Sequence, residues 1–291
     1  MNSEEVKPVL LAVLAHPDDE TFGMGGTLAL YASRGVDVHL VCATRGEAGE
    51  MPPELLEGFE STAERREHEL RCAAGVLGLA GVHFLDYRDS GMPGSPDNEH
   101  PEALAAAPVE KVAAKVAGYI RRIRPQVVVT FDPLGGYLHP DHVACHQATV
   151  RAFELAADES FDSDEVAGLP PWGADKLYYS VFPKGLLRFA VRALPLFGQD
   201  PHRFGRNGDI DLVKLVEGGD FPIHAAIDIT PVQAEREDAT YCHASQLGGG
   251  GMPRRGPLNW ILRWFNRREY FMRAYPPAED GPREDDLFAG L

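Results

Sequence analysis

Two short runs of apolar residues leave this chain little freedom in its fold. Residues 9–15 read VLLAVLA and residues 126–132 read QVVVTFD, and each run leads into a segment rich in turn-forming residues. A strand that is apolar on both faces has to be covered on both, which is typical of parallel sheets flanked by helices. The two runs therefore predict buried strands of an α/β fold.

Strand-like and helix-like periodicities alternate along much of the chain. Such alternation implies βαβ units, in which each helix crosses over a parallel sheet. We expect a Rossmann-like, mostly parallel sheet with helices on both faces and a functional site at the carboxyl ends of the strands. The expected helices cover residues 25–35, 63–79 and 109–123, and the expected further strands cover residues 36–44, 82–87, 176–182 and 221–229.

No internal repeat or change of composition divides the 291 residues, so we expect one domain over residues 1–291. Residues 230–233 read TPVQ, which puts threonine, proline and glutamine at the N-cap, N1 and capping-box positions of a predicted helix. The glycine-rich segment at about 247–257 is expected to be a mobile loop. The acidic tail at about 278–291 is expected to be a solvated end.

Charge and cysteine content restrict the partners and the compartment. The formal net charge of −16 argues against a broad phosphate-neutralising surface, and so against a nucleic-acid partner. No signal peptide precedes Val9, and no apolar run approaches the roughly 20 residues needed to span a bilayer. We therefore expect a cytoplasmic protein without a membrane partner. The four cysteines form no CxxC pair, and the apolar settings of Cys42 and Cys72 favour buried free thiols.

Each of the two apolar runs leads into a loop rich in histidine and aspartate. The first continues as HPDDE, residues 16–20, and the second as PLGGYLHPDH, residues 133–142. In open α/β sheets ligands bind outside the carboxyl ends of the strands, where both loops are expected. Carboxylates gathered at the end of a buried strand need something to face, such as water, a helix N-terminus, an arginine or a metal ion.

The residue types in these loops match a zinc site that is open to water. A catalytic zinc takes three nitrogen or oxygen ligands and leaves one position for water. His16, Asp19 and one of His139 or His142 would supply that set. Helix capping by Asp18, or a hydrogen-bonded loop role for one histidine, explains each residue alone. It does not explain two clusters at the ends of two buried strands, so the pattern indicates a metal site.

The combination of AHPDDE and GGYLHPDH resembles the PIG-L/LmbE family of zinc-dependent N-acetylglucosamine deacetylases. Within that family the chain is most similar to the enzymes of mycothiol and bacillithiol metabolism and to the related thiol-conjugate amidase. The likeness spans most of the chain. It extends through the weaker motifs ATRGEAGE (43–50), RREHEL with VLGL (65–79), DYRDSGM (86–92) and CHASQ (242–246).

The resemblance implies a metal centre with a base beside it. By position, His16, Asp19 and His142 correspond to the zinc ligands, and Asp18 corresponds to the general base. One Zn²⁺ per chain is expected, with another divalent metal such as Fe²⁺ as the alternative. Bound zinc lowers the pKa of water to about 7 and polarises the acetyl oxygen. Attack by the zinc-bound water would then release the acetyl group while Asp18 takes the water proton.

Other residues of the motifs acquire roles from the same resemblance. His139 corresponds to the group that stabilises or protonates the tetrahedral species, and Asp141 to the carboxylate that holds His139. Tyr137 corresponds to a mobile tyrosine that polarises the substrate carbonyl. The residues that correspond to contacts with the sugar or its substituent are Glu47, Arg66 and Asp89.

Three other functions fit parts of the pattern. A nicotinamide-dependent oxidoreductase would have G-x-G-x-x-G where this chain has HPDDETFGMGG. A metal-dependent phosphoesterase would usually need a second metal, and the sequence has no third cluster of ligands. A non-catalytic zinc-binding module would close the fourth position with a protein ligand, and it has no use for Asp18 beside Asp19.

The expected function is therefore that of a zinc-dependent hydrolase that deacetylates a small molecule containing N-acetylglucosamine (GlcNAc). Hydrolysis of a mycothiol-type thiol conjugate on the same site is the alternative reaction. The sequence leaves open the aglycone of the substrate, whether the chain forms a homo-oligomer, and whether the role is biosynthetic or detoxifying.

Overall fold

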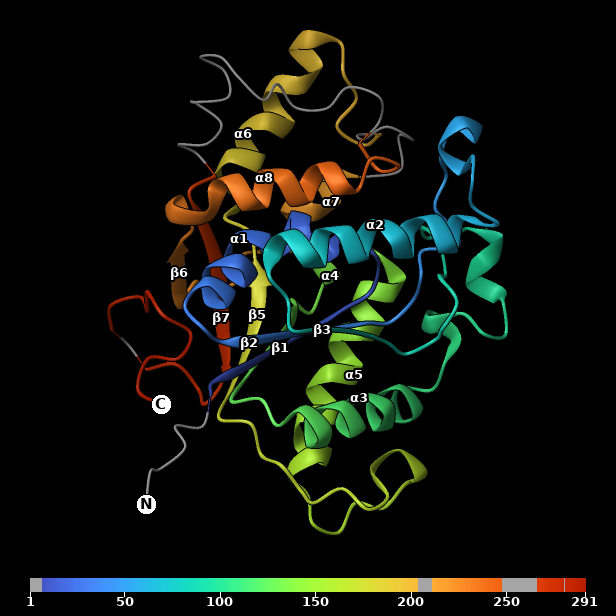
Figure 1. Cartoon of the computed structure of the whole chain (residues 1–291). Helices are drawn as coiled ribbons and strands as arrows, with labels where there is room; N and C mark the ends of the chain where they lie inside the picture. The colour runs from blue at the N-terminus through green and yellow to red at the C-terminus, as the bar shows by residue number, and fades with distance from the viewer. Residues whose placement is uncertain (1–6, 204–210, 248–265, 280) are drawn as a thin grey trace.

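In the computed structural model a seven-stranded sheet crosses the described part of the chain, which comprises residues 7–203, 211–247, 266–279 and 281–291 (Figure 1). The strand order is β3-β2-β1-β4-β5-β7-β6, and all pairs from β3 to β5 are parallel. β7 runs antiparallel to both of its neighbours. The strands are β1 (Val9–Leu14), β2 (Asp37–Cys42), β3 (Gly81–Phe84), β4 (Val127–Phe131), β5 (Lys176–Val181), β6 (Ala225–Asp228) and β7 (Arg268–Tyr275).

Helices cover both faces of the sheet (Figure 1). α1, α2 and α8 lie on one face, and α3 and α5 pack together on the other. The predicted α/β fold, with a mostly parallel sheet between two helical layers, is confirmed. None of the described helices combines the length and apolarity that a bilayer span requires. The helices are α1 (Asp19–Ser33), α2 (Thr62–Leu77), α3 (Val109–Ile123), α4 (Gly135–Leu138), α5 (Pro140–Ala157), α6 (Lys184–Ala193), α7 (Leu212–Glu217) and α8 (Gln233–Cys242).

The central strands are buried because both helical layers press on them. Every residue of β4 and β5 is buried, and in β1 only the first residue, Val9, is partly exposed. The amphipathic helix α3 turns its Val112, Val116 and Ile120 side chains into this core, where all three are at most 2% exposed. The apolar runs at residues 9–15 and 126–132 thus form adjacent core strands, as predicted.

Helix boundaries follow local capping chemistry in two of the predicted helices. α2 begins after Ser61, whose side chain accepts a hydrogen bond from the backbone N–H of Glu64, and ends at Gly78 in the left-handed conformation. α3 ends at Arg124, which has a φ of 59° and directly precedes Pro125. The helix predicted at residues 230–233 instead starts as a 3-10 turn over Thr230–Val232, and α8 follows at Gln233.

α1 is interrupted, and a carboxylate on β7, near the end of the chain, caps its second half. Met24 has a non-helical φ of −153°, which frees backbone N–H groups in the following turn. The carboxylate of Glu269, on β7, accepts the N–H groups of Gly26 (3.0 Å) and Thr27 (2.7 Å). The helix predicted from residue 25 is therefore the second half of α1.

The acidic end of the chain is exposed at most of its described residues, as expected of a solvated tail, but two of its residues pack against the sheet. Glu284 accepts hydrogen bonds from Lys176 (3.1 Å), Tyr178 (2.6 Å) and Arg273 (2.6 Å), and Leu287 is fully buried. The reason is that β5 and β7 present cations to which the acidic segment is complementary. Of the glycine-rich segment predicted to be a mobile loop, the residues after 247 lie outside the described residues.

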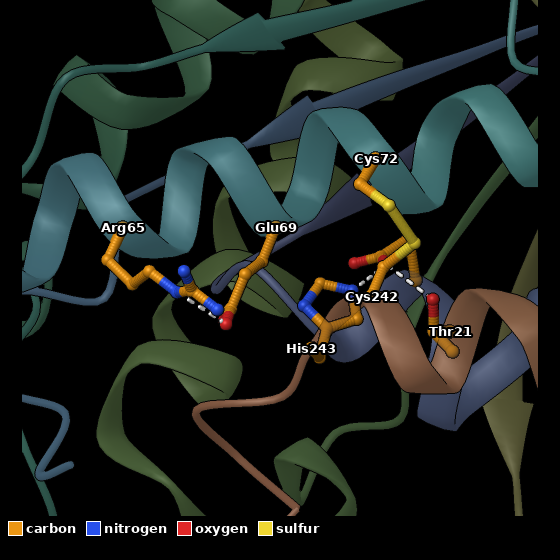
Figure 2. The surroundings of a disulfide bond; sticks show 7 residues. Thr21, Arg65, Glu69, Cys72, Cys242 and His243 are labelled. Carbon is orange, nitrogen blue, oxygen red and sulfur yellow. Dashed lines mark hydrogen bonds and ion pairs between the residues drawn. A yellow bond between two sulfur atoms is a disulfide. The ribbon is translucent and has the colours of Figure 1, made fainter. Parts of the chain in front are cut away.

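Cys72 was predicted to be a free thiol, but it forms a disulfide with Cys242 (Figure 2). The two residues are 170 positions apart in sequence, but α2 and α8 pack side by side and bring their Cα atoms to 5.7 Å. Cys42 and Cys145 are buried free thiols, which confirms the prediction for Cys42. The bond links a predicted helix to a segment whose position no local pattern reveals.

Candidate metal centre and adjoining pocket

The two histidine-rich loops meet because their strands are neighbours. β1 and β4 pair in parallel, with Leu10 opposite Val127, so the loops after them leave the same edge of the sheet. The first loop carries His16 and Asp18 into α1, and the second carries His139 into α5. Both loops therefore aim their side chains at one point outside the carboxyl ends of the strands.

Donor atoms of three residues converge at that point. The His16 Nδ1 and His142 Nε2 atoms are 3.2 Å apart, the Oδ2 atom of Asp19 lies 3.6 Å from the first, and its Oδ1 atom lies 3.3 Å from the second. Ligands at zinc bond lengths of about 2.0–2.1 Å in a tetrahedron are separated by about 3.3 Å. The spacing of the three donors therefore fits a single small divalent cation.

The Nδ1 atom of His16 and the Nε2 atom of His142 face each other, and neither carries a proton when the rings are neutral. The hydrogen bonds of the other two ring nitrogens explain why. The Nε2 of His16 lies 3.0 Å from an Asp141 carboxylate oxygen, and the Nδ1 of His142 lies 3.1 Å from the carbonyl of Gly135. We assign the ring protons to these nitrogens because each faces an acceptor. Burial lowers the pKa of His142 to about 4, which keeps this ring neutral. Two lone pairs and a carboxylate thus face one another when the rings are neutral, an arrangement that suits a cation.

The surroundings of His16 favour positive charge. Burial disfavours a charged imidazole, but the carboxylates of Asp89, Asp141 and Asp19 outweigh it and raise the pKa of His16 well above its usual value. Burial would likewise raise the pKa of Asp19, yet His142 and His16 hold it below its usual range. The same negative charges that attract a proton to His16 attract a metal cation in its place, so the residues present fit a divalent metal.

His139 lies beside the three donors but is oriented differently. Its ligand nitrogen lies within 4.8 Å of those of His16 and His142, so distance alone does not exclude it as a ligand. However, its Nδ1 accepts the backbone N–H of Asp141 at 3.2 Å, which puts the proton of the neutral ring on Nε2. Burial, followed by the nearby His16 and His142, lowers the pKa of His139 to about 2. The ring is therefore a neutral hydrogen-bond donor toward the site.

Asp141 does not hold His139, contrary to the prediction. Its carboxylate contacts the Nε2 of His16, accepts the backbone N–H of Ser90 at 2.9 Å and accepts the Ser90 hydroxyl. Asp141 is fully buried. The Nδ1 of His139 is already occupied by the Asp141 backbone, so the carboxylate turns to the other loop and orients His16.

Asp18 has an unusual backbone and a restrained side chain. Its φ of 132° is rare for any residue other than glycine, and its side chain makes no capping bond to α1. Its Oδ2 accepts a hydrogen bond from Arg66 at 3.1 Å. Burial raises the pKa of Asp18 to about 6, and Arg66 opposes the shift. The helix-capping alternative for Asp18 is therefore not what the structure contains.

Two buried residues that sequence reasoning left without a role support the first loop. Glu20 accepts the backbone N–H of Asp18 at 3.0 Å, and its other oxygen lies 2.6 Å from the Nε2 of His243. Glu20 and His243 are both fully buried. Figure 2 shows His243 beside the Cys72–Cys242 disulfide at the end of α8. The weak CHASQ motif was the signal in the sequence, because it contains this histidine.

A polar pocket of about 390 Å³ opens next to the donors. Asp89 and Arg66 face it, and their groups lie 3.9 Å apart. Glu47, predicted to contact the sugar, does not line it; its carboxylate accepts the backbone N–H of Asp89 at 3.0 Å and supports that residue. The lining includes the predicted site residues His16, Asp18, Arg66, Asp89, Tyr137 and His139, together with Glu50, Ser95 and Gln246.

Tyr137 borders the pocket on the side of the second loop. Its ring meets that of His142 edge-on, with centroids 4.8 Å apart. It follows Gly135 and Gly136, whose φ values of 62° and 70° suit glycine and turn the loop sharply. Burial raises the pKa of Tyr137 above its usual value, so its hydroxyl remains a donor at neutral pH.

Among protein families, the chain matches the model described as "PIG-L: GlcNAc-PI de-N-acetylase" over residues 11–153. Both loops fall inside that range. Among curated proteins, the chain is 39% identical to one from Thermobifida fusca (strain YX), over 96% of this chain and 98% of the relative. It is 43% identical to one from Thermomonospora curvata, over 97% and 96%. Both relatives are named 1D-myo-inositol 2-acetamido-2-deoxy-alpha-D-glucopyranoside deacetylase.

Solved structures share the fold at low sequence identity. The N,N'-diacetylchitobiose deacetylase from Pyrococcus horikoshii superposes with a TM-score of 0.60 at 21% identity, over 91% of this chain and 83% of that one. The 4-carboxy-2-hydroxymuconate hydratase GalB from Pseudomonas putida KT2440 gives 0.58 at 21%, over 94% and 99%. Because a hydratase stands beside a deacetylase, the fold alone does not identify the reaction.

Proposed function

This chain belongs to the PIG-L family, and we propose from that premise that it hydrolyses the acetamide of a GlcNAc-containing small molecule. The two relatives at 39% and 43% identity cover nearly its whole length. The names of these relatives give their substrate as N-acetylglucosamine linked to myo-inositol. The observation that carries the proposal is the convergence of three lone-pair donors beside a half-buried carboxylate, Asp18, at the wall of a polar pocket.

His16, Asp19 and His142 would hold one divalent cation in this proposal. Their two imidazoles and one carboxylate are the ligand types that suit zinc, with Fe²⁺ as the alternative. When bound, zinc would supply a lower pKa for water and a polarised amide carbonyl. Asp141 keeps His16 in the tautomer that turns Nδ1 toward the cation, and the carbonyl of Gly135 does the same for His142.

Asp18 would act as the proton carrier. It takes a proton from the water that adds to the amide carbon and later passes it to the nitrogen as the C–N bond breaks, which leaves a free amine and acetate. Arg66 restrains the carboxylate at 3.1 Å, and Glu20 anchors its backbone. The pKa of about 6 lets Asp18 be ionised at neutral pH and still accept a proton readily.

His139 and Tyr137 would stabilise the negative charge that develops on the amide oxygen. Both are neutral donors at pH 7, because burial lowers the pKa of His139 and raises that of Tyr137. Asp89 and Arg66 would bind hydroxyl groups of the sugar in the polar pocket, since both face it. Arg66 would also position Asp18.

The test is an assay of free amine with the zinc-loaded protein. The panel contains GlcNAc linked to myo-inositol, free GlcNAc and N,N'-diacetylchitobiose, with released amine and acetate both measured. We expect equal amounts of the two products and the highest kcat/KM on the inositol compound. Full zinc occupancy with no amine from any compound would refute the proposal and favour a non-catalytic zinc-binding module.

A further inference from the structure

A second cavity, of about 210 Å³, lies behind the proposed metal centre. Two of the three donor residues, Asp19 and His142, contribute to its wall, whereas the polar pocket is bordered by the third, His16. Tyr137 lines both spaces, so it stands between them. The proposed cation site is therefore approached from two sides, by a polar pocket and by this second cavity.

The second cavity is apolar where the first is polar. Apart from Asp19, Tyr137, His142 and Ser180, its wall is apolar and is formed mainly by the side chains of Phe22, Met24, Phe131 and Phe182. Phe22 and Phe182 are 40% and 56% exposed and line the same cavity, so apolar surface is offered next to the proposed site.

An amide bound at the metal centre has to extend in both directions. Its carbonyl carbon bears the amine portion on one side and the acyl chain on the other. If the sugar occupies the polar pocket beside Asp18, the acyl chain points past Tyr137 toward the apolar cavity. An acetyl group places a single methyl there. An apolar cavity of about 150 Å³ already accommodates benzene, so 210 Å³ has room for a chain of about six carbons.

We propose that this cavity is an acyl subsite, and that the chain hydrolyses glucosamine amides of straight-chain acids of about four to six carbons as well as acetamides. The inference rests on the proposed function, because it uses the same centre and the same hydrolysis. Water adds to the amide carbon, the C–N bond breaks, and the products are the free amine and the corresponding carboxylate. Acyl groups with a terminal charge are excluded, because a carboxylate buried unpaired beside Asp19 is disfavoured.

The first experiment compares amides of one glucosamine scaffold that differ only in the acyl group. The zinc-loaded protein is assayed with the acetyl, butanoyl, hexanoyl and succinyl derivatives. We expect kcat/KM to rise with chain length by up to about fourfold per buried methylene, and the succinyl derivative to be poorer than the butanoyl. A steady fall from acetyl through butanoyl to hexanoyl would overturn the acyl subsite but leave the deacetylase proposal standing. Failure of all four derivatives would overturn both.

Gly23 provides a variant that fills the cavity without forcing the backbone. It lines the cavity on α1, and a Cβ atom added there meets no atom within 4 Å. Gly23→Leu should lower the hexanoyl-to-acetyl ratio of kcat/KM by about 10–200-fold, the usual discrimination when a hydrophobic pocket loses room for a methylene. An unchanged ratio would overturn the subsite.

Gly75→Leu is the matched control. Gly75 is an exposed residue of α2, and a Cβ atom there also meets nothing within 4 Å. Both variants replace a glycine of a helix by leucine, so the control shows what that change does away from the cavity. The hexanoyl-to-acetyl ratio of Gly75→Leu should equal that of the unmodified chain. Zinc content and circular dichroism verify that both variants are folded and loaded; a fall of the ratio in Gly75→Leu equal to that in Gly23→Leu would count against the subsite.

Discussion

The loops after β1 and β4 contain the same three residues in order, His-Pro-Asp, yet the structure uses them in opposite ways. In the first loop the histidine, His16, is a donor of the proposed metal centre and the aspartate, Asp18, faces the pocket. In the second loop the histidine, His139, faces the pocket, and the aspartate, Asp141, is buried behind the centre. In both loops the fourth residue, which follows His-Pro-Asp and is Asp19 in the first and His142 in the second, is a proposed donor to the metal.

The backbone explains the exchange. Asp18 precedes α1 with a φ of 132°, which turns its side chain away from the helix and toward the pocket. The second loop enters α5 regularly, with His139 as the N-cap residue and Pro140 in the first turn. Asp141 therefore points inward from the first turn of a regular helix. The comparison teaches that a short motif fixes the residue types, whereas the way the chain enters the helix fixes which of them faces the pocket.

The largest expected effect comes from the fourth position. His142→Ala removes a donor and should reduce both zinc content and deacetylation to background, because the remaining pair cannot hold the cation. The loss of zinc affinity should exceed the about 10–100-fold typical of residues that only support a ligand. Metal analysis after dialysis measures it. Normal zinc content in this variant would mean that the fourth position is not equivalent in the two loops.

The next effect tests the pocket-facing aspartate. Asp18→Asn preserves size but cannot accept the proton of the attacking water, so kcat should fall by about 10²–10⁴-fold while zinc remains bound. The acid limb of the kcat/KM profile against pH should flatten or move, since ionisation of this group is required for activity. Asp18 and the neighbouring groups titrate together, so the limb reports the cluster. Near-normal turnover with zinc bound would show that Asp18 is not the proton carrier.

The pocket-facing histidine should give a somewhat smaller effect. His139→Ala removes one donor to the developing oxyanion, and kcat should fall by about 10²–10³-fold with zinc content unchanged. Zinc analysis on the same sample as the kinetics separates the two histidines. If this variant loses its zinc, the assignments of His139 and His142 have to be reversed.

The smallest effect distinguishes the two carboxylates of the motif. Asp141→Asn weakens the hold on His16, so zinc affinity should fall by about 10–100-fold, and turnover at saturating zinc should be largely kept. Competition with a chelator gives the affinity. The opposite result, normal zinc affinity with low kcat, would restore the predicted pairing of Asp141 with His139. The comparison between the loops would then lose its main support.

The parallel core of the fold was predictable from the sequence because its strands are continuous in apolarity. β1 and β4 stand out for that reason, and α3 stands out by its apolar stripe. β7 does not, because its sequence REYFMRAY mixes charged and apolar residues around Glu269, which has a partner on α1. The contacts of the acidic tail were missed for the same reason. Composition shows that the tail is negatively charged, but not that Lys176 on β5 lies opposite Glu284.

The residue types of the candidate site were predictable, but several of their contacts were not. The motifs identify His16 and Asp19, and neighbouring parallel strands imply that the second loop joins them. The contact of His243 with Glu20 spans 223 positions, and the disulfide of Cys72 spans 170. No periodicity encodes such distances; they follow from α8 packing against α1 and α2.

The capping of α1 by Glu269 has a consequence for the order of events during synthesis. The residues of both loops leave the ribosome early, but β7 is made about 40 residues after β6, a delay of about 2–8 s at 5–20 residues per second. Until then β5 exposes an unpaired edge, and the N–H groups of Gly26 and Thr27 await their acceptor. The nascent chain thus has every proposed metal donor before it has the strand that secures α1. Chains truncated before residue 268 should therefore be more prone to aggregation than the full chain.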